Sequence, residues 1–335
     1  MTTTAIITFT VDHMHHAAQM LTARHQRDRG QQPLSPAQFD AEAALQTALE
    51  KPRSQGIAAF NGENILGYLL DYRLHTPTFG RTAWLGLSGY ALAEDASIEL
   101  YRDMYAVLAE KWVCDGYFDH FVMVPAARHD LLDLWFSLGF GMQQGYALLD
   151  LRTWKNTAPV PVDVTVRLAT PDDADAVRAM ADTIAQYQMQ SPVFAPVPPE
   201  VIREDIRPGM VDLIEDPAWT LWLAEKDSQI VGYQGYAVNE YDPTSPMIPE
   251  NCIELSISGT VATARGSGVG RALTAHGLRH AQIAGYDYCL TDWRTTNLSS
   301  SRFWPRFGFA PVAYRLTRHI DPRIMWTTRF KCSYT

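Results

Sequence analysis

The chain has 335 residues, of which 47% are hydrophobic and 19% charged, and its formal net charge at pH 7 is −9. This length favours two domains, each large enough to bury its own core. The acidic balance and the absence of a Lys/Arg run argue against nucleic acid as the main ligand, because phosphate contacts need clustered positive charge.

The first residues and the cysteines indicate the compartment. Residues 1–5 lack the basic and apolar regions of a signal peptide, and no apolar run approaches membrane-spanning length. The four cysteines, at positions 114, 252, 289 and 332, include no close pair that would indicate a zinc site or a redox motif. We therefore expect free thiols, no metal, no membrane contact and a cytoplasmic location.

In the first half of the chain, hydrophobic periodicity and turn signals predict alternating strands and helices. A strand is expected over residues 5–10 and a helix over 11–25, followed by a helix over 35–50 with Pro36 just inside its start. Asn61-Gly62 is the strongest short hairpin signal and joins the next two expected strands. The remaining expected elements are strands over 56–60, 65–73, 83–92, 117–124 and 142–151 and helices over 97–114 and 129–138.

The same order of patterns returns in the second half. Matching segments lie 160, 165, 169 and 169 residues apart, an offset that grows slowly and then stays constant; they begin at Thr10 and Thr170, Ile65 and Ile230, Gly116 and Gly285, and Trp135 and Trp304. Chance matches would not drift in one direction, so the chain is predicted to be a duplication. The expected domains are 1–152 and 163–335, separated by a polar, proline-containing linker at 153–161.

A glycine-rich turn stands between an expected strand, residues 253–261, and an expected helix, residues 272–284. A turn of this kind leaves backbone N–H groups unpaired at a helix start, where the helix dipole favours an anion. It is not a Walker loop, because Gly270 is followed by Arg271 and Ala272, and a dinucleotide fingerprint would need a third glycine at Arg271. The candidate pyrophosphate cradle consists of Arg265, Gly266, Ser267, Gly268, Val269, Gly270 and Arg271.

A second motif follows another expected strand at 286–293. Residues 297–309 carry an Asn, small residues, two aromatic residues in sequence and then Gly-Phe. Together the two motifs resemble motifs A and B of the GNAT family of N-acetyltransferases, which bind the pyrophosphate of acetyl-CoA at the first motif. The resemblance implies an α/β (α+β) fold of two tandem GNAT domains, each with a mixed, mostly antiparallel sheet flanked by helices.

The first copy departs from this pattern. Residues 96–102 stand opposite the cradle and contain no glycine, whereas Glu99 places a carboxylate where phosphate would lie. The resemblance therefore implies a degenerate, structural first domain and a second domain that uses acetyl-CoA as co-substrate. The local basic residues Arg265, Arg271, Arg302 and Arg306 fit a small polyanion of this kind.

By resemblance, backbone N–H groups near Thr260 and Val261 would polarise the thioester carbonyl, and Asn297 and Ser300 would flank the pantetheine arm. Glu254 stands eleven residues before Arg265, where histone-acetylating members carry their catalytic Glu. The two-residue period of a strand would place Glu254, Ser256, Ser258 and Thr260 on one face. Asp292, at the end of the next strand, is the competing base.

The general acid is left open by the sequence. Many GNAT members have a Tyr at the second aromatic position of motif B, but Trp304 stands there, and an indole cannot protonate a thiolate. Tyr314 or water are the alternatives. The leading function is an acetyl-CoA-dependent N-acetyltransferase for a small-molecule amine, as a monomer or homodimer; a non-catalytic acyl-CoA sensor is the rival, and a dinucleotide enzyme comes third.

Overall fold

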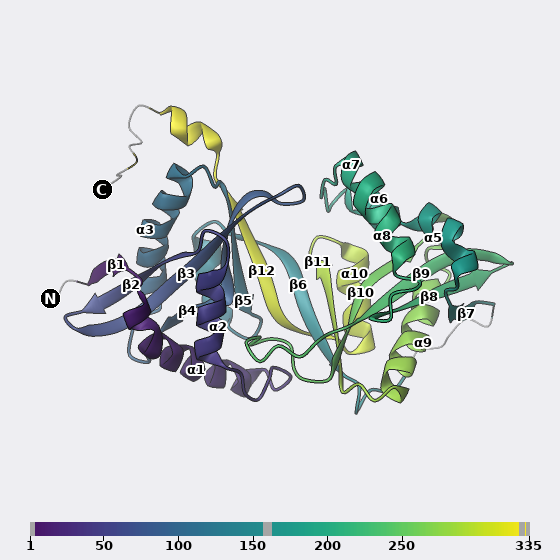
Figure 1. The fold of residues 1–335 in the computed structure, drawn as a ribbon, viewed down its shortest axis with the longest axis horizontal. Coiled ribbons are helices and arrows are strands. Elements are labelled where there is room, and N and C mark those ends of the chain that lie inside the picture. Colours follow the sequence, from purple (N-terminus) through teal and green to yellow (C-terminus); the bar gives the residue numbers. More distant parts are fainter. Residues whose placement is uncertain (1–3, 157–162, 328–331, 333–335) are drawn as a thin grey trace. The chain divides into compact units, whose positions relative to one another are not determined.

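The computed structural model describes residues 4–156, 163–327 and 332 and divides into two compact units. Unit 1 contains residues 1–145, 242–248 and 312–335, and unit 2 contains residues 146–241 and 249–311. Figure 1 shows the ribbon coloured along the sequence. In the described part of the chain, no helix combines the length and the hydropathy needed to cross a membrane.

In unit 1 the strand order is β1-β2-β3-β4-β5-β12, and only the β4–β5 pair is parallel. The strands are β1 (Ala5–Thr8), β2 (Gln55–Asn61), β3 (Asn64–Thr76), β4 (Gly80–Leu92), β5 (Asp119–Pro125) and β12 (Ala310–His319). The predicted Asn-Gly hairpin is confirmed, since β2 and β3 pair through Asn61 and Asn64 around Gly62, whose φ is +62°.

Helices cover both faces of this sheet. They are η1 (Val11–His13), α1 (Met14–Gln31), α2 (Ala41–Glu50), α3 (Leu100–Cys114), α4 (His129–Ser137) and, near the C-terminus, η6 (Pro322–Trp326). Residues of α1 and α2 pack with Tyr68 and Leu70 in one apolar cluster, whereas α3 and α4 pack with Leu69 and Tyr90 in another. Alternating side chains of β3 thus serve opposite layers.

In unit 2 the strand order is β11-β10-β9-β8-β7, and only the β10–β11 pair is parallel. The strands are β7 (Thr165–Leu168), β8 (Trp219–Lys226), β9 (Gln229–Val238), β10 (Cys252–Thr260) and β11 (Tyr288–Arg294). One face carries α9 (Val269–Ile283) with α10 (Leu298–Phe303) and η5 (Trp304–Phe307). The opposite face carries α5 (Ala174–Met180), α6 (Thr183–Gln188) and α8 (Arg207–Asp212). Shorter turns are η2 (Pro171–Asp173), α7 (Pro199–Val201), the π-helical η3 (Ile202–Ile206) and η4 (Ala262–Ala264).

The predicted duplication is visible in backbone geometry. Gly116 and Gly285 have φ values of +77° and +90°, and Gly139 and Gly308 have φ values of +83° and +96°. Each pair occupies equivalent positions of the repeat. A left-handed residue after a helix is a position that favours glycine, so both copies keep the same chain reversals.

The last strands of the two sequence copies are exchanged between the units. The second copy's last strand, β12, pairs antiparallel with β5 of the first copy, from Ala313 opposite Pro125 to His319 opposite Asp119. The first copy's last strand, β6 (Gly141–Asp150), enters unit 2 at Tyr146, where Ala147, Leu149 and Leu151 join the core. The contact-based units therefore differ from the contiguous segments 1–152 and 163–335, whose assignment as sequence domains stays a prediction; linker residues 157–162 lie outside the described residues.

Two expectations for unit 1 were wrong. The second helix begins at Ala41 and not near residue 35, because Asp40 caps it by accepting a hydrogen bond from the Ala43 N–H at 2.9 Å. Cys114 and Cys332 are joined in a disulfide, a pairing across 218 residues that sequence spacing does not reveal. The other two cysteines, Cys252 and Cys289, are free and buried, as expected.

The exchange generates a prediction about truncation. Expressed alone, residues 163–335 should be much less soluble and have a lower Tm than the whole chain, because the fragment lacks three buried apolar side chains of the unit 2 core, Ala147, Leu149 and Leu151. Thermal unfolding and sedimentation check this. A longer fragment, 141–335, restores β6 and should recover part of the loss; a 163–335 fragment as stable as the whole chain would contradict the expected role of the exchanged strand.

Candidate functional site

The two parallel strands of unit 2 diverge at the place where the site is expected. β10 pairs with β11 from Cys252 opposite Tyr288 to Leu255 opposite Thr291, and this register ends although both strands continue. Thr291 marks the last link, because its hydroxyl donates to the carbonyl of Leu255 at 2.9 Å. The edge of β10 that faces β11 is therefore without strand pairing from residue 256 to residue 260 in the described register, and we call this unpaired edge the slot.

The slot exposes one of the two predicted backbone donors. The Val261 N–H donates to the Val231 carbonyl at 3.0 Å, so the expectation that Val261 offers a free N–H was wrong. Successive N–H groups of a strand point to opposite edges, so the N–H of Thr260 is directed toward the β11 side. Thr260 is the residue positioned to hydrogen bond with a ligand in the slot.

The glycine-rich loop has the geometry that its sequence predicts. Gly266 and Gly268 have φ values of +79° and +92°, and Gly268 is the N-cap of α9. The hydroxyl of Ser267 donates to the Ala264 carbonyl at 2.7 Å and so holds the turn. The first N–H groups of a helix have no partner within the helix, so the start of α9 is a candidate anion site.

Arg265 is tied to the loop and to a residue that sequence analysis missed. Its Nε donates to the Thr260 carbonyl at 3.2 Å, and its guanidinium lies 4.6 Å from the ring centroid of Tyr187. The hydroxyl of Tyr187 lies 2.9 Å from the Ser299 hydroxyl. Tyr187, on α6, thus contacts both predicted motifs. No sequence signal could have found it, because the contact with Ser299 spans 112 residues.

The second motif starts with a helix cap. The side-chain oxygen of Asn297 accepts a hydrogen bond from the Ser300 N–H at 3.1 Å, and Asn297 is buried. Asn297 and Ser300 therefore lie together at the start of α10, and the amide oxygen is engaged in capping it. Trp304 is buried with Phe309 in the core of unit 2, where it serves packing.

A β-bulge in β10 overturns the expected single face of polar residues. The register with β9 shifts between Leu255 and Ile257, so Ser256 is an extra residue that reverses the alternation. Gln234 donates both to Ser258 at 3.1 Å and to Thr274 of α9 at 3.0 Å, which places Ser258 on the α9 face. Glu254 lies before the bulge on the opposite face, next to Ile253 and Leu255, which pack in the α9-side cluster.

The two candidate bases come together. Burial raises the pKa of Glu254, and the negative charge of Asp292 raises it further; the Asn239 amide, which donates to Glu254 at 3.4 Å, acts in the other direction. Glu254 and Asp292 thus form an interacting pair of carboxylates where the strands diverge. Tyr314, in contrast, belongs to unit 1, where it lies opposite Val124 of β5 and burial raises its pKa.

The equivalent slot of unit 1 is filled by its own side chains. β4 and β5 also stop pairing, at Leu85 opposite Val122. Beyond that point the Tyr90 hydroxyl donates to the Met123 carbonyl at 2.7 Å and spans the two strands. The guanidinium of Arg24 donates to the Tyr90 carbonyl and lies over the Tyr90 ring.

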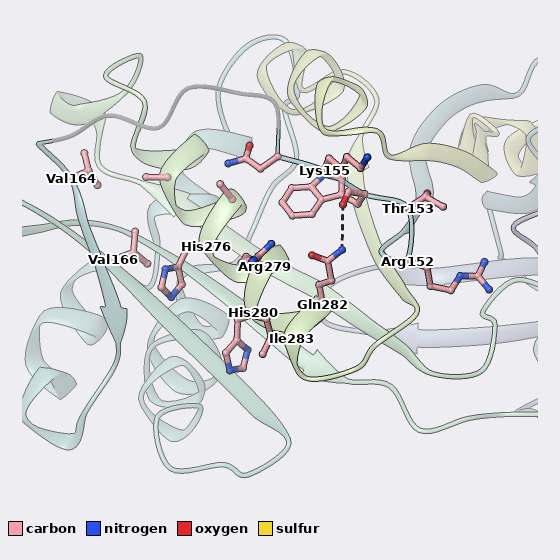
Figure 2. A pocket seen from close by; sticks show the side chains of 14 residues that line it. Arg152, Thr153, Lys155, Val164, Val166, His276, Arg279, His280, Gln282 and Ile283 are labelled. Atoms are coloured by element: carbon pink, nitrogen blue, oxygen red, sulfur yellow. Dashed lines mark hydrogen bonds between the residues drawn. The ribbon is translucent and has the colours of Figure 1, made fainter.

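A groove of about 1140 Å³ lies elsewhere in unit 2 (Figure 2). It runs along the outer side of α9, where Gln282 donates to the carbonyls of Leu151 at 2.7 Å and Trp154 at 3.3 Å. The lining includes His276, Arg279 and Lys155 but none of the predicted acyl-donor residues. Among the residues that the structure describes, no group of three or more His, Cys, Asp or Glu side chains could hold a metal ion.

Comparisons with known proteins agree with this geometry. Residues 183–309 match the model of the Acetyltransferase (GNAT) family. A Mycothiol acetyltransferase of Frankia casuarinae is 30% identical over 164 residues, 48% of this chain and 45% of the relative. A Mycothiol acetyltransferase of Streptomyces avermitilis is 28% identical over 171 residues, 50% of this chain and 49% of the relative. The matches thus span about half the length of these curated relatives.

Solved structures share the fold at low identity. A GCN5-related N-acetyltransferase from Sphaerobacter thermophilus aligns with a TM-score of 0.57 at 13% identity, covering 94% of this chain and 95% of that one. A tandem GNAT protein from the clavulanic acid biosynthesis pathway aligns with a TM-score of 0.51 at 13% identity, covering 95% and 98%. The predicted fold class, tandem GNAT domains with mixed sheets flanked by helices, is confirmed.

The cradle generates a prediction. Gly268→Asp should weaken acetyl-CoA binding at least about 100-fold, because a carboxylate and a side chain at a φ of +92° would stand at the helix start that is to hold the pyrophosphate. Isothermal titration measures the Kd. Glu99→Ala, at the corresponding position of unit 1, is the matched control and should leave the Kd unchanged; equal losses in both variants would contradict a single site.

Proposed function

We propose that the chain, whose residues 183–309 match the model of the Acetyltransferase (GNAT) family, transfers an acetyl group from acetyl-CoA to the amine of a small molecule. The observation that carries the proposal is the combination of the slot between β10 and β11 with the glycine cradle that opens α9. An acyl-CoA has a pyrophosphate, which the start of α9 would bind, and an extended arm, which the unpaired strand edge would bind, so the two features support the proposal.

Each part of the donor has a proposed contact in unit 2. The N–H groups of residues 269–271 would bind the pyrophosphate, with Gly266, Gly268 and Gly270 keeping the approach open and Arg265 and Arg271 supplying charge. Ser267 would hold the turn. The N–H of Thr260 would bind the thioester carbonyl and polarise it. Asn297 and Ser300, at the start of α10, would border the arm on its other side.

Glu254 is the proposed base, and Asp292 the residue that tunes it. An amine attacks a thioester only when it is neutral, so a group that accepts its proton raises the rate. The raised pKa of Glu254 increases its affinity for a proton, which suits it to this role better than an ordinary exposed carboxylate. The arrangement of the two carboxylates on one face also favours a cationic amine as the arriving acceptor.

Unit 1 is proposed to be structural. Its slot is occupied by Tyr90 and Arg24, and around the start of α3 Glu99 and buried Tyr101 stand where unit 2 carries Gly268 and Gly270. It supplies the partner strand for β12 in place of a second donor site. A cytoplasmic location and a monomeric or homodimeric state remain predictions.

The proposed function is tested with acetyl-CoA and a panel of primary amines that includes mycothiol-related amines, by following release of the CoA thiol. Thiol release that depends on one amine supports the transferase. Tight acetyl-CoA binding without thiol release for any amine would favour the rival function, an acyl-CoA sensor. This rival is considered because Trp304, at the usual position of the general acid, is buried. A protein that binds no acetyl-CoA would contradict both.

The base is tested separately. Glu254→Gln should lower kcat by about 100-fold at neutral pH, because the amide keeps the shape of the side chain and cannot accept a proton. The wild-type rate should rise with pH as Glu254 ionises, because only its ionised form can accept the proton. The rise should be centred above the usual carboxyl range, because burial and the charge of Asp292 raise the pKa of Glu254. Rates measured across pH 4–9 check both points.

Asp292→Asn provides the control for this pH profile. Removing the neighbouring negative charge should lower the pKa of Glu254, so the rise in rate should move to lower pH while the maximal rate stays within about threefold. A profile unchanged by Glu254→Gln but abolished by Asp292→Asn would transfer the base to Asp292.

A further inference from the structure

The hydroxyl of Tyr233 is a buried polar group that has no hydrogen-bond partner in the described structure. Tyr233 lies in β9, is 1% exposed, and packs in the apolar cluster of α5 and α8 with Met180 and Met210. A buried hydroxyl without a partner destabilises a fold, and folded proteins retain few such groups. Within the described residues, the Tyr233 hydroxyl therefore keeps a hydrogen bond that it can donate to a ligand.

The ring of Tyr233 crosses the neighbouring strand toward the slot. Tyr233 lies opposite Gly259 of β10, and a Cβ built on Gly259 would lie 2.6 Å from two ring carbons and 2.7 Å from the hydroxyl oxygen. The hydroxyl therefore lies directly over the backbone of Gly259. Because β10 separates β9 from β11, the hydroxyl points toward the edge of β10 that β11 leaves unpaired.

The hydroxyl is also on the face of the proposed base. Tyr233 packs with the helices opposite α9, and the bulge at Ser256 places Glu254 on this same face. Gly259 directly precedes Thr260, whose N–H is the proposed donor to the thioester carbonyl. The reacting carbon would thus lie between the backbone donor, the base and the phenol.

We propose that Tyr233 is a catalytic residue that donates a hydrogen bond to the sulfur of the acyl donor as it leaves. This inference rests on the proposed acetyltransferase function and adds a residue that neither motif contains. The hydrogen bond from Tyr233 would stabilise the negative charge on the leaving sulfur. Trp304, at the position of the usual acid in the second motif, cannot protonate that sulfur.

The step balances as follows. The neutral amine nitrogen forms a bond to the carbonyl carbon, and the carbonyl electron pair moves to oxygen at the N–H of Thr260. As that pair returns, the C–S bond breaks and the sulfur leaves with its electron pair, stabilised by the Tyr233 hydroxyl. The nitrogen loses a proton to Glu254 through water, and Glu254 then releases it to solvent. The CoA thiolate takes one proton from solvent, so that amide and CoA thiol result and no net proton is consumed.

Tyr233 is suited to donate a hydrogen bond and to keep its proton. Burial raises the pKa of Tyr233, and the nearby charge of Asp182 acts in the same direction. The phenol is therefore neutral over the whole working range and presents a permanent donor. Among the described residues the hydroxyl has no hydrogen-bond acceptor, so it need not give up a protein partner when the sulfur becomes negative.

Tyr233→Phe tests the inference, because it removes one oxygen atom and keeps the ring. We expect kcat for the amine identified in the acceptor screen to fall about 10- to 100-fold while the Kd for acetyl-CoA stays within twofold, since the bond forms fully only in the transition state. The Tm should rise or stay the same, because the variant loses a buried hydroxyl that has no partner.

Tyr236→Phe is the matched control on the same strand. The Tyr236 hydroxyl donates to Gln234 at 2.8 Å and lies on the α9 face, so its removal leaves a buried acceptor unpaired. This variant should have a lower Tm and an unchanged kcat per folded molecule. We therefore expect Tyr236→Phe to lose stability and keep its activity, and Tyr233→Phe to lose activity and keep its stability.

The outcomes separate this inference from the proposed function. A wild-type protein that transfers acetyl groups and a Tyr233→Phe variant with the same kcat would overturn the role of Tyr233 alone. A variant that loses activity together with Tm or acetyl-CoA binding would also overturn it, because that result indicates a structural role. A wild-type protein without transferase activity toward any amine would overturn the proposed function and this inference with it.

Discussion

Parallel pairing between β10 and β11 ends at Leu255 and Thr291, and the candidate site of unit 2 depends on this interruption. Had the two strands stayed paired to their ends, the N–H of Thr260 would have an inter-strand partner and no slot would lead to the cradle. The bulge at Ser256 coincides with the end of pairing. A bulge increases the local twist of its strand, which gives a physical reason for the divergence.

The two units differ in the side chains that lie where their parallel strands separate. Both units have a parallel pair that separates, yet Tyr90 joins the separated strands of unit 1 through Met123, whereas unit 2 keeps Gly259 and the orphan hydroxyl of Tyr233 near the corresponding gap. A gap closed by its own hydrogen bonds adds stability and cannot admit a ligand. Among the described residues, buried polar atoms without a partner occur in both units, for example Asp71 Oδ1 in unit 1 and the Tyr233 hydroxyl in unit 2, but only that of Tyr233 lies beside a separated parallel pair in unit 2.

The last strand of each sequence copy contributes residues to the unit that contains most of the other copy. Unit 1 obtains β12 from the end of the chain, and unit 2 obtains Ala147 and Leu149 from the end of the first copy. Neither sequence copy therefore contains all of the residues that its core buries.

The sequence by itself determined the repeated order of elements and the glycine-rich turn before α9, because these rest on local patterns. Examples are the Asn-Gly hairpin, the helix starts at Thr10 and Thr170, and Gly268 at a left-handed position. Only the tertiary structure decided which side chains meet. The Cys114–Cys332 disulfide, the contact of Tyr187 with Ser299, the face of Glu254 and the position of Tyr314 depend on residues far apart in the chain or on a single bulged residue. One inserted residue reverses a strand's alternation, and a period of two cannot reveal where that insertion falls.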